Sequence, residues 1–156
     1  MATKDYSIKQ EKMVADYLGW ECVVASGARP CHPGDIISDY WMGECKTHVT
    51  TGNRVRFNFK EWEKICDEAM SRGKFPVLFS DDGSQKDKNT WCMINTKTAP
   101  LESIPPAITQ IISKQSLYLT SEFMEMCDNS ELKILRFDFN GRDVFVMRLS
   151  TFSSIC

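Results

Sequence analysis

The run GDIISDYWMGECKTH, at residues 34–48, constrains this chain most, because charged side chains interrupt two short apolar segments. Strand-like residues with turn formers between them predict one strand at Asp35–Trp41 and another at Glu44–Val49, joined by a turn near Met42-Gly43. Two adjacent short strands of this kind belong in a partly buried sheet. The presence of ionisable side chains in such a sheet needs a physical explanation. A functional site that uses these side chains would provide one.

Strand geometry sorts these charged side chains by face. Successive side chains of a strand point to opposite faces, so Glu44 and Lys46 should share one face while Cys45 takes the other. Asp35 opens the preceding strand. The bland interpretation is an exposed hairpin with ordinary surface charges, and the sharper one is a site built from two acids and a lysine.

A helix is predicted upstream, from about Tyr6 to Leu18, and ends before Gly19. At 3.6-residue spacing its inward face consists of Ile8, Glu11, Val14, Ala15 and Leu18. Glu11 thus lies within an apolar stripe, which is an unusual place for a carboxylate.

Further elements follow at regular intervals. Strands are predicted at residues 20–25, 75–80 and 90–95, and the segment 81–89 between the last two should be a solvated loop. A helix capped by Asn58 should run to about Arg72, with an inward stripe of Trp62, Ile65, Cys66, Ala69 and Met70. After residue 95 the sequence predicts short helices near 106–114 and 121–127, then a hairpin with an Asn-Gly turn whose Phe137, Phe139 and Phe145 pack in a half-buried sheet.

The order of these elements predicts an α/β fold with a central mixed β-sheet flanked by α-helices and a C-terminal helix and β-hairpin extension. With 156 residues the chain is expected to be one domain, 1–156, with a core at about 6–95 and the extension at about 96–156. No apolar run approaches the ~20 residues of a membrane span. The seven cysteines, without an export signal, are expected to be reduced thiols in a cytoplasmic protein.

Paired carboxylates beside a lysine are typical of sites that hydrolyse phosphodiesters. Such hydrolysis uses divalent cations that neutralise the phosphate and activate water. Mg²⁺ prefers oxygen ligands and keeps several waters, so two or three carboxylates suffice. The net charge of −2 gives no overall basic footprint for nucleic acid, although acids that ligate a metal do not repel phosphate.

The combination of Glu11, the Ser26–Ala28 loop, the GDI run at 34–36 and Glu44-Cys45-Lys46 resembles the D-x(n)-E-x-K, or restriction-endonuclease-like, nuclease superfamily. Within it the chain is most similar to archaeal and phage Holliday-junction resolvases. The likeness covers about residues 6–95. It implies a Mg²⁺-dependent endonuclease of DNA recombination and repair that acts on branched DNA as a homodimer, with Mn²⁺ able to replace Mg²⁺ and a phage origin plausible.

The resemblance also implies roles for single residues. Metal ligands would be Asp35, Glu44, the carbonyl of Cys45 and Glu11, while Lys46 would position or polarise the attacking water. Ser26 would touch the scissile backbone. Phosphate contacts would come from Arg29, Arg54, Arg56 and Lys60.

Other interpretations stay open at this stage. The same site could serve a restriction-like or repair nuclease that cuts linear, flap or nicked DNA, or the chain could be an inactive nucleic-acid-binding protein with a nuclease fold. A zinc site at Cys31, His32, Cys45 and His48 lacks the usual ligand spacing, and Cys45 is better explained as a buried structural thiol.

Overall fold

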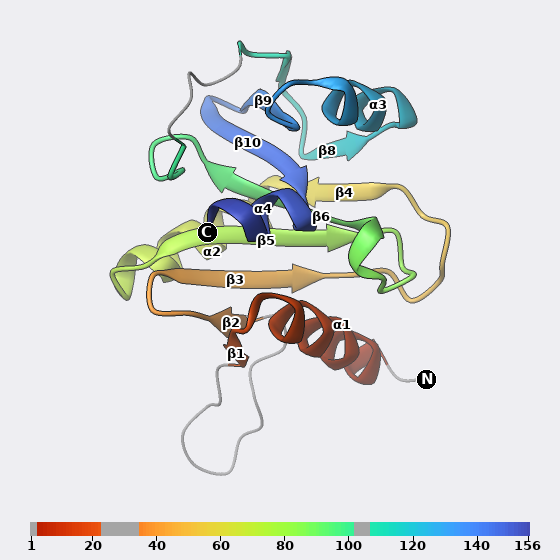
Figure 1. The fold of residues 1–156 in the computed structure, drawn as a ribbon, viewed down its shortest axis with the longest axis vertical. Coiled ribbons are helices and arrows are strands. Elements are labelled where there is room, and N and C mark those ends of the chain that lie inside the picture. Colours follow the sequence, from red (N-terminus) through yellow and green to blue (C-terminus); the bar gives the residue numbers. More distant parts are fainter. Residues whose placement is uncertain (1–2, 23–34, 102–106) are drawn as a thin grey trace.

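The computed structural model describes residues 3–22, 35–101 and 107–156, which form an α/β fold around one large mixed sheet (Figure 1). This confirms the predicted fold class. The first half of the chain contains α1 (Thr3–Leu18), β1 (Glu21–Cys22), β2 (Asp35–Ile37), β3 (Trp41–Lys46), β4 (Val55–Asn58), α2 (Phe59–Ser71) and β5 (Phe75–Asp81). The second half contains η1 (Asp87–Asn89), β6 (Thr90–Asn95), β7 (Gln110–Ile112), β8 (Ser116–Leu119), α3 (Ser121–Asn129), β9 (Ile134–Phe139), β10 (Arg142–Arg148) and α4 (Leu149–Ile155).

The sheet has the strand order β1-β2-β3-β5-β6-β10-β9-β7. Strands β1, β2 and β3 pair antiparallel, and α2 then carries the chain over to β5, which runs parallel to β3. The C-terminal extension continues this sheet, because β10 pairs with β6 and β9 pairs with β10. A second, two-stranded sheet is formed by β4 and β8.

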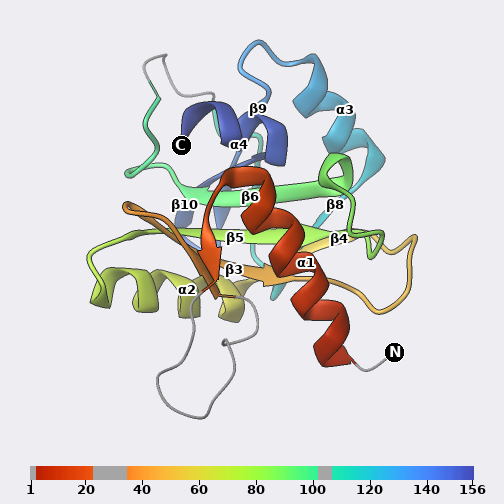
Figure 2. The ribbon, with the colours of Figure 1, turned by 60° about the horizontal axis from the view of Figure 1, so that its bottom comes forward.

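Helices cover both faces of the large sheet. In Figure 2, α1 crosses in front of the strands and α4 lies above them, while α2 lies below them. The two faces have separate apolar cores: one gathers side chains of α2, β4, β8 and α3, and the other gathers side chains of α1 and α4. Alternate residues of β3 contribute to different cores, since Met42 packs in the first while Trp41 and Cys45 pack in the second.

The capping and hairpin predictions are confirmed. The Asn58 side chain accepts hydrogen bonds from the backbone N–H groups of Lys60 and Glu61 and so caps α2. The final hairpin turns at Asn140-Gly141, where both residues have positive φ, as a tight hairpin turn requires. The three predicted hairpin phenylalanines are fully buried: Phe137, Phe139 and Phe145.

The predicted turn at Met42-Gly43 is wrong. Both residues lie inside β3, and the chain turns instead at Ser38–Tyr40. The Ser38 hydroxyl accepts a hydrogen bond from the backbone N–H of Trp41 at 3.0 Å, which stabilises the turn there. Glycine is common in turns, but Gly43 is needed for close packing against its neighbours in the sheet.

Other predictions from local sequence pattern are wrong because contacts with distant residues decide the structure there. Instead of a helix within 107–114, Gln110–Ile112 forms β7 and pairs parallel with β9, which suits its β-branched residues. Ile8 and Met70, predicted to face inward, are exposed. The segment 81–89 is not simply solvated: Asp81 is buried and accepts hydrogen bonds from the Thr47 hydroxyl and from two backbone N–H groups of its own loop.

Gly43 allows β3 and β5 to pack tightly. A Cβ at this position would lie 2.5 Å from Cε2 of Phe79, whose ring is fully buried. We expect Gly43→Ala to lower the free energy of unfolding by about 1–3 kcal/mol, the usual cost of overpacking a core. Urea denaturation of the wild type and of Gly43→Ala measures this loss of stability. Adding Phe79→Leu should recover part of the loss, and a double variant that is less stable than the sum of the two would contradict this explanation.

An ion pair joins α3 to the end of β10. Arg148 donates from Nε to Asp128 Oδ1 at 2.7 Å and from Nη2 to Oδ2 at 2.9 Å. The hydrogen bonds from Arg148 hold the pKa of Asp128 below its usual value of 3.8. Because both side chains are partly exposed, the pair should contribute only about 0.5–1 kcal/mol.

The lowered pKa fixes how this contribution depends on pH. It is present above pH 3.8 and is lost as the pH falls through the folded-state pKa of Asp128. Urea denaturation should therefore find Asp128→Asn less stable than the wild type at pH 7, with the difference shrinking below pH 4. A difference that grows on acidification would contradict the ion pair.

Candidate functional site

The site is built where β3 faces α2. Glu44 and Lys46 both contact side chains of α2, so they share one face of the sheet as predicted. Cys45 points to the opposite face and is buried in the core beneath α1. Burial raises the pKa of the Cys45 thiol well above its usual value, and the nearby charge of Glu11 raises it further. The thiol is therefore a structural group, and its role as a buried cysteine is confirmed.

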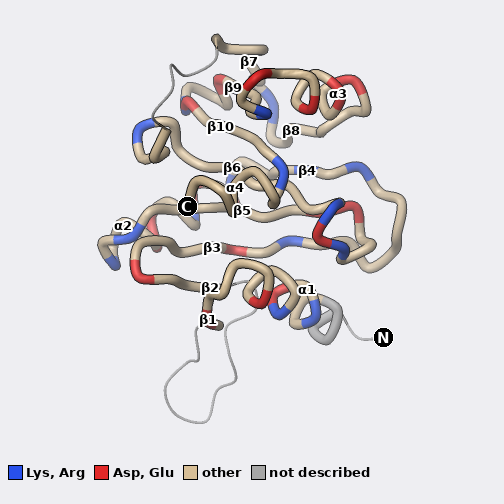
Figure 3. Tube along the Cα trace, viewed as in Figure 1, with Lys and Arg blue, Asp and Glu red and all other residues tan. Residues whose placement is uncertain are grey.

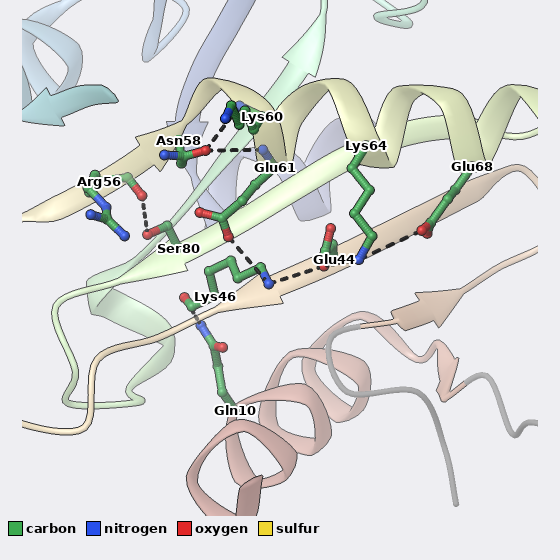
Figure 4. Close-up of polar contacts among 10 residues, drawn as sticks. All are labelled: Gln10, Glu44, Lys46, Arg56, Asn58, Lys60, Glu61, Lys64, Glu68 and Ser80. Atoms are coloured by element: carbon green, nitrogen blue, oxygen red, sulfur yellow. Dashed lines mark hydrogen bonds and ion pairs between the residues drawn. The ribbon is translucent and has the colours of Figure 1, made fainter. Parts of the chain in front are cut away.

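A chain of ion pairs connects β3 to α2 (Figure 4). The Nζ of Lys46 lies 3.2 Å from Glu44 Oε1 and 3.3 Å from Glu61 Oε2. The Nζ of Lys64 lies 3.3 Å from the same Glu44 Oε1 and 3.8 Å from Glu68 Oε1. Glu44 is thus held between two lysines, each of which also contacts a glutamate of α2.

Glu44 is the buried centre of this network. Its side chain is 1% exposed, whereas those of Lys46 and Lys64 are 42% and 59% exposed. Among the described residues, no hydrogen-bond donor reaches its second oxygen, Oε2, which is also buried. A buried carboxylate oxygen without a donor is costly unless a cation or water completes its shell. The chemistry of this oxygen therefore fits a metal ligand.

Lys46 is set up as a cation and hydrogen-bond donor. Partial burial opposes its charge, but the carboxylates of Glu44 and Glu61 outweigh this effect and raise its pKa above the usual value. A lysine held in this form cannot remove a proton from water at neutral pH. It can donate to an anionic oxygen.

The strand register brings Asp35 to this region. Asp35 is the residue of β2 directly paired with Glu44 of β3. Among the side chains that the structure describes, no three metal-ligating groups converge. The two acids singled out by the sequence are thus neighbours across two adjacent strands.

The first helix approaches the same strand from the other face. Glu11 is buried, as predicted from its place in the apolar stripe, and its charge acts on Cys45. Beside it, the amide of Gln10 donates from Nε2 to the carbonyl oxygen of Lys46 at 2.7 Å. This hydrogen bond fixes the end of β3, where the functional side chains lie, against α1.

The predicted phosphate contacts that the structure describes are not members of the ion-pair network. Arg54, Arg56 and Lys60 are exposed and lie just before β4, within β4 and at the start of α2. Figure 3 shows acidic and basic positions interspersed along the described chain, with basic positions on β4. Ser26 and Arg29 lie outside the described residues.

Lys64 and Glu61 enter the site although the sequence interpretation assigned them no role in it. A signal for them exists: Glu61, Lys64 and Glu68 follow each other at spacings of three and four, so they form a polar stripe on α2. That stripe borders the buried stripe of Trp62 and Ile65, which faces the sheet. Charged residues beside a buried stripe can reach the strands that the helix covers.

The chain was compared with known proteins in three ways. No family model matches it, and no similar protein was found among curated proteins or among solved structures. No helix in the described part of the chain is long and apolar enough to cross a membrane. Proposals about function therefore depend on the site itself.

Proposed function

We propose that this protein is a metal-dependent, structure-selective DNA endonuclease, with a Holliday-junction resolvase as the first candidate. The observation that carries the proposal is the buried Glu44 carboxylate, which is paired in register with Asp35 and contacted by two lysines. The arrangement of α1, three antiparallel strands, a crossing helix and a parallel strand supports it as the scaffold expected for such nucleases.

Asp35 and Glu44 would hold the metal, with the carbonyl of Cys45 as a further candidate. Glu11, the other acid named by the sequence, approaches β3 from the opposite face of the sheet, so it is the least direct of the candidate ligands. The buried Oε2 of Glu44 has no donor among the described residues and suits this role. A bound Mg²⁺ or Mn²⁺ would supply a lowered pKa for the attacking water and charge neutralisation at the phosphate. Hydrolysis joins a water oxygen to phosphorus and breaks the P–O3′ bond, leaving a 5′-phosphate and a 3′-hydroxyl.

The lysines supply positive charge where the reaction builds up negative charge. Lys46, protonated and positioned by Glu61, can donate a hydrogen bond to the attacking or the phosphate oxygen. Lys64 sits equally close to Glu44 and adds a second cation on the exposed side of the site. Both lysines also form ion pairs with the buried Glu44 carboxylate.

The proposal includes the way in which DNA is held. Exposed Arg54, Arg56 and Lys60 would contact phosphates beside the cut, with Ser26 and Arg29 as further candidates. A homodimer would place two sites so that a four-way junction is cut symmetrically. Sedimentation at micromolar concentration, with and without junction DNA, measures this state.

A cleavage assay tests the proposal. A four-way junction, linear duplex, flap and single-stranded DNA, each end-labelled, are incubated with the protein in Mg²⁺ and in EDTA. Paired symmetric nicks on the junction alone, dependent on Mg²⁺, would support a resolvase. Metal-dependent cutting of flaps or duplex would favour the repair-type nuclease instead. Intact substrates throughout, together with binding of DNA, would overturn the enzyme proposal in favour of a binding protein.

A further inference from the structure

A groove of about 250 Å³ lies beside β4, where the segment from β7 to β8 passes it. Its lining includes the cations Arg54 and Lys114, the aromatic ring of Tyr118 and the apolar Ile111, and none of the described residues that line it is an aspartate or glutamate. Ile111 and Tyr118 are 65% and 41% exposed, although both are large. The groove therefore combines positive charge with exposed flat and apolar surface.

The two cations are available to a ligand. The guanidinium of Arg54 stacks over the ring of Tyr118, with Cζ 4.6 Å from the ring centroid. Among the described residues, no carboxylate forms an ion pair with Arg54 or Lys114, whereas Arg136, Arg142 and Arg148 all have acidic partners. Unpaired cations beside an exposed aromatic ring are suited to an anion that also carries a flat ring.

The groove adjoins the candidate site through the start of α2. Asn58, which caps α2, pairs in register with Ser116 of β8, and the backbone N–H of Phe59 donates to the carbonyl of Gln115 at 2.8 Å. The same helix carries Glu61 and Lys64 in its first two turns. The groove and the ion-pair network are thus linked through backbone contacts at the start of α2.

We propose that this groove binds one unpaired nucleotide of a nucleic-acid strand. The base would stack on the Tyr118–Arg54 pair and contact Ile111, while Lys114 would contact the adjacent phosphate. Stacking of this kind accepts any base, because every base has a π-face. The inference rests on the proposed nuclease function and refines its substrate class to branched DNA with an unpaired nucleotide beside the cut strand. It also gives residues 110–118 of the C-terminal extension a role in substrate choice.

Binding without cleavage tests the groove. A fluorescent 20-nucleotide oligothymidine and a 20-base-pair duplex are titrated with the protein in EDTA, followed by anisotropy. For the single strand, Tyr118→Ala should weaken binding by about 5- to 150-fold, whereas Tyr118→Phe should bind as the wild type does. Lys114→Ala should make the salt dependence shallower, by about 0.7 in the slope of log K against log salt. Lys88→Ala is the control. Lys88 is an exposed lysine of η1, an element that packs with α1 and α4, so its replacement should change neither the single-strand affinity nor its salt dependence.

The outcomes separate this inference from the proposed function. Single-strand binding that depends on Tyr118 supports the groove even if no DNA is ever cut. Metal-dependent cleavage combined with unchanged single-strand binding in Tyr118→Ala overturns the groove alone. Equal losses for the duplex and the single strand overturn the assignment to an unpaired nucleotide, as does a wild type that does not bind the oligothymidine.

Discussion

Glu44→Gln is expected to lower the rate of DNA cleavage at least about 1,000-fold, because it removes the charge from the one described carboxylate that is buried at the centre of the site. Glutamine has nearly the same shape, so the fold should persist. Its amide cannot replace a carboxylate as a ligand of a hard cation. Single-turnover cleavage of a junction in Mg²⁺ measures the effect, with circular dichroism to verify folding.

Glu68→Gln is the matched control for this variant. It makes the same chemical change in the same network, but among the described residues the Glu68 carboxylate forms an ion pair only with Lys64, at 3.8 Å, at the end of the network. We expect its cleavage rate to stay near that of the wild type. The cleavage rate of Glu61→Gln should lie between those of Glu44→Gln and Glu68→Gln. We expect a loss of about 10- to 100-fold, because Glu61 positions Lys46. Equal losses in Glu44→Gln and Glu68→Gln would contradict a central role for Glu44.

The second large effect concerns the C-terminal extension. Phe137 in β9 is fully buried, and its ring contacts that of Phe123 in α3 edge-on, with centroids 5.3 Å apart. Phe137→Ala should lower the free energy of unfolding by about 3–5 kcal/mol, the usual cost of removing a buried aromatic ring. Because β9, β10 and β6 belong to one sheet, the whole chain should still unfold in a single transition.

Denaturation followed by two signals measures this prediction. Tryptophan fluorescence reports on the tertiary core, and far-ultraviolet circular dichroism reports on helices and strands. Phe75→Ala is the control, since this phenylalanine is 41% exposed and should cost far less. Two separate transitions in the wild type would show instead that residues 96–156 form an independent unit.

Much of the site could be predicted from local pattern. Alternation along a strand separates Glu44 and Lys46 from Cys45, and helical spacing turns Glu11 inward, without knowledge of the neighbours. Asn58 caps α2 through its own side chain, and Asn140-Gly141 specifies its hairpin turn. Each of these features depends on residues that are close in sequence.

The wrong predictions fall at positions where residues distant in sequence determine the local structure. Gly43 looks like a turn former until Phe79, on β5, occupies the space where its side chain would be. Ile111 and Ile112 become a strand because β9 offers a free edge. The approach of Lys64 to Glu44 depends on how α2 lies across β3, which no local pattern specifies. The polar stripe of α2 only shows that such a contact is possible.

Metal binding in the absence of DNA tests the central claim most directly. Isothermal titration of Mn²⁺ into the wild type, Asp35→Asn and Glu44→Gln measures whether these two acids form one cation site. The proposed function predicts binding by the wild type that is lost in both variants, while Glu68→Gln binds normally. No binding by the wild type, or equal binding by all four proteins, would contradict a metal site at Asp35 and Glu44 and the nuclease proposed from it.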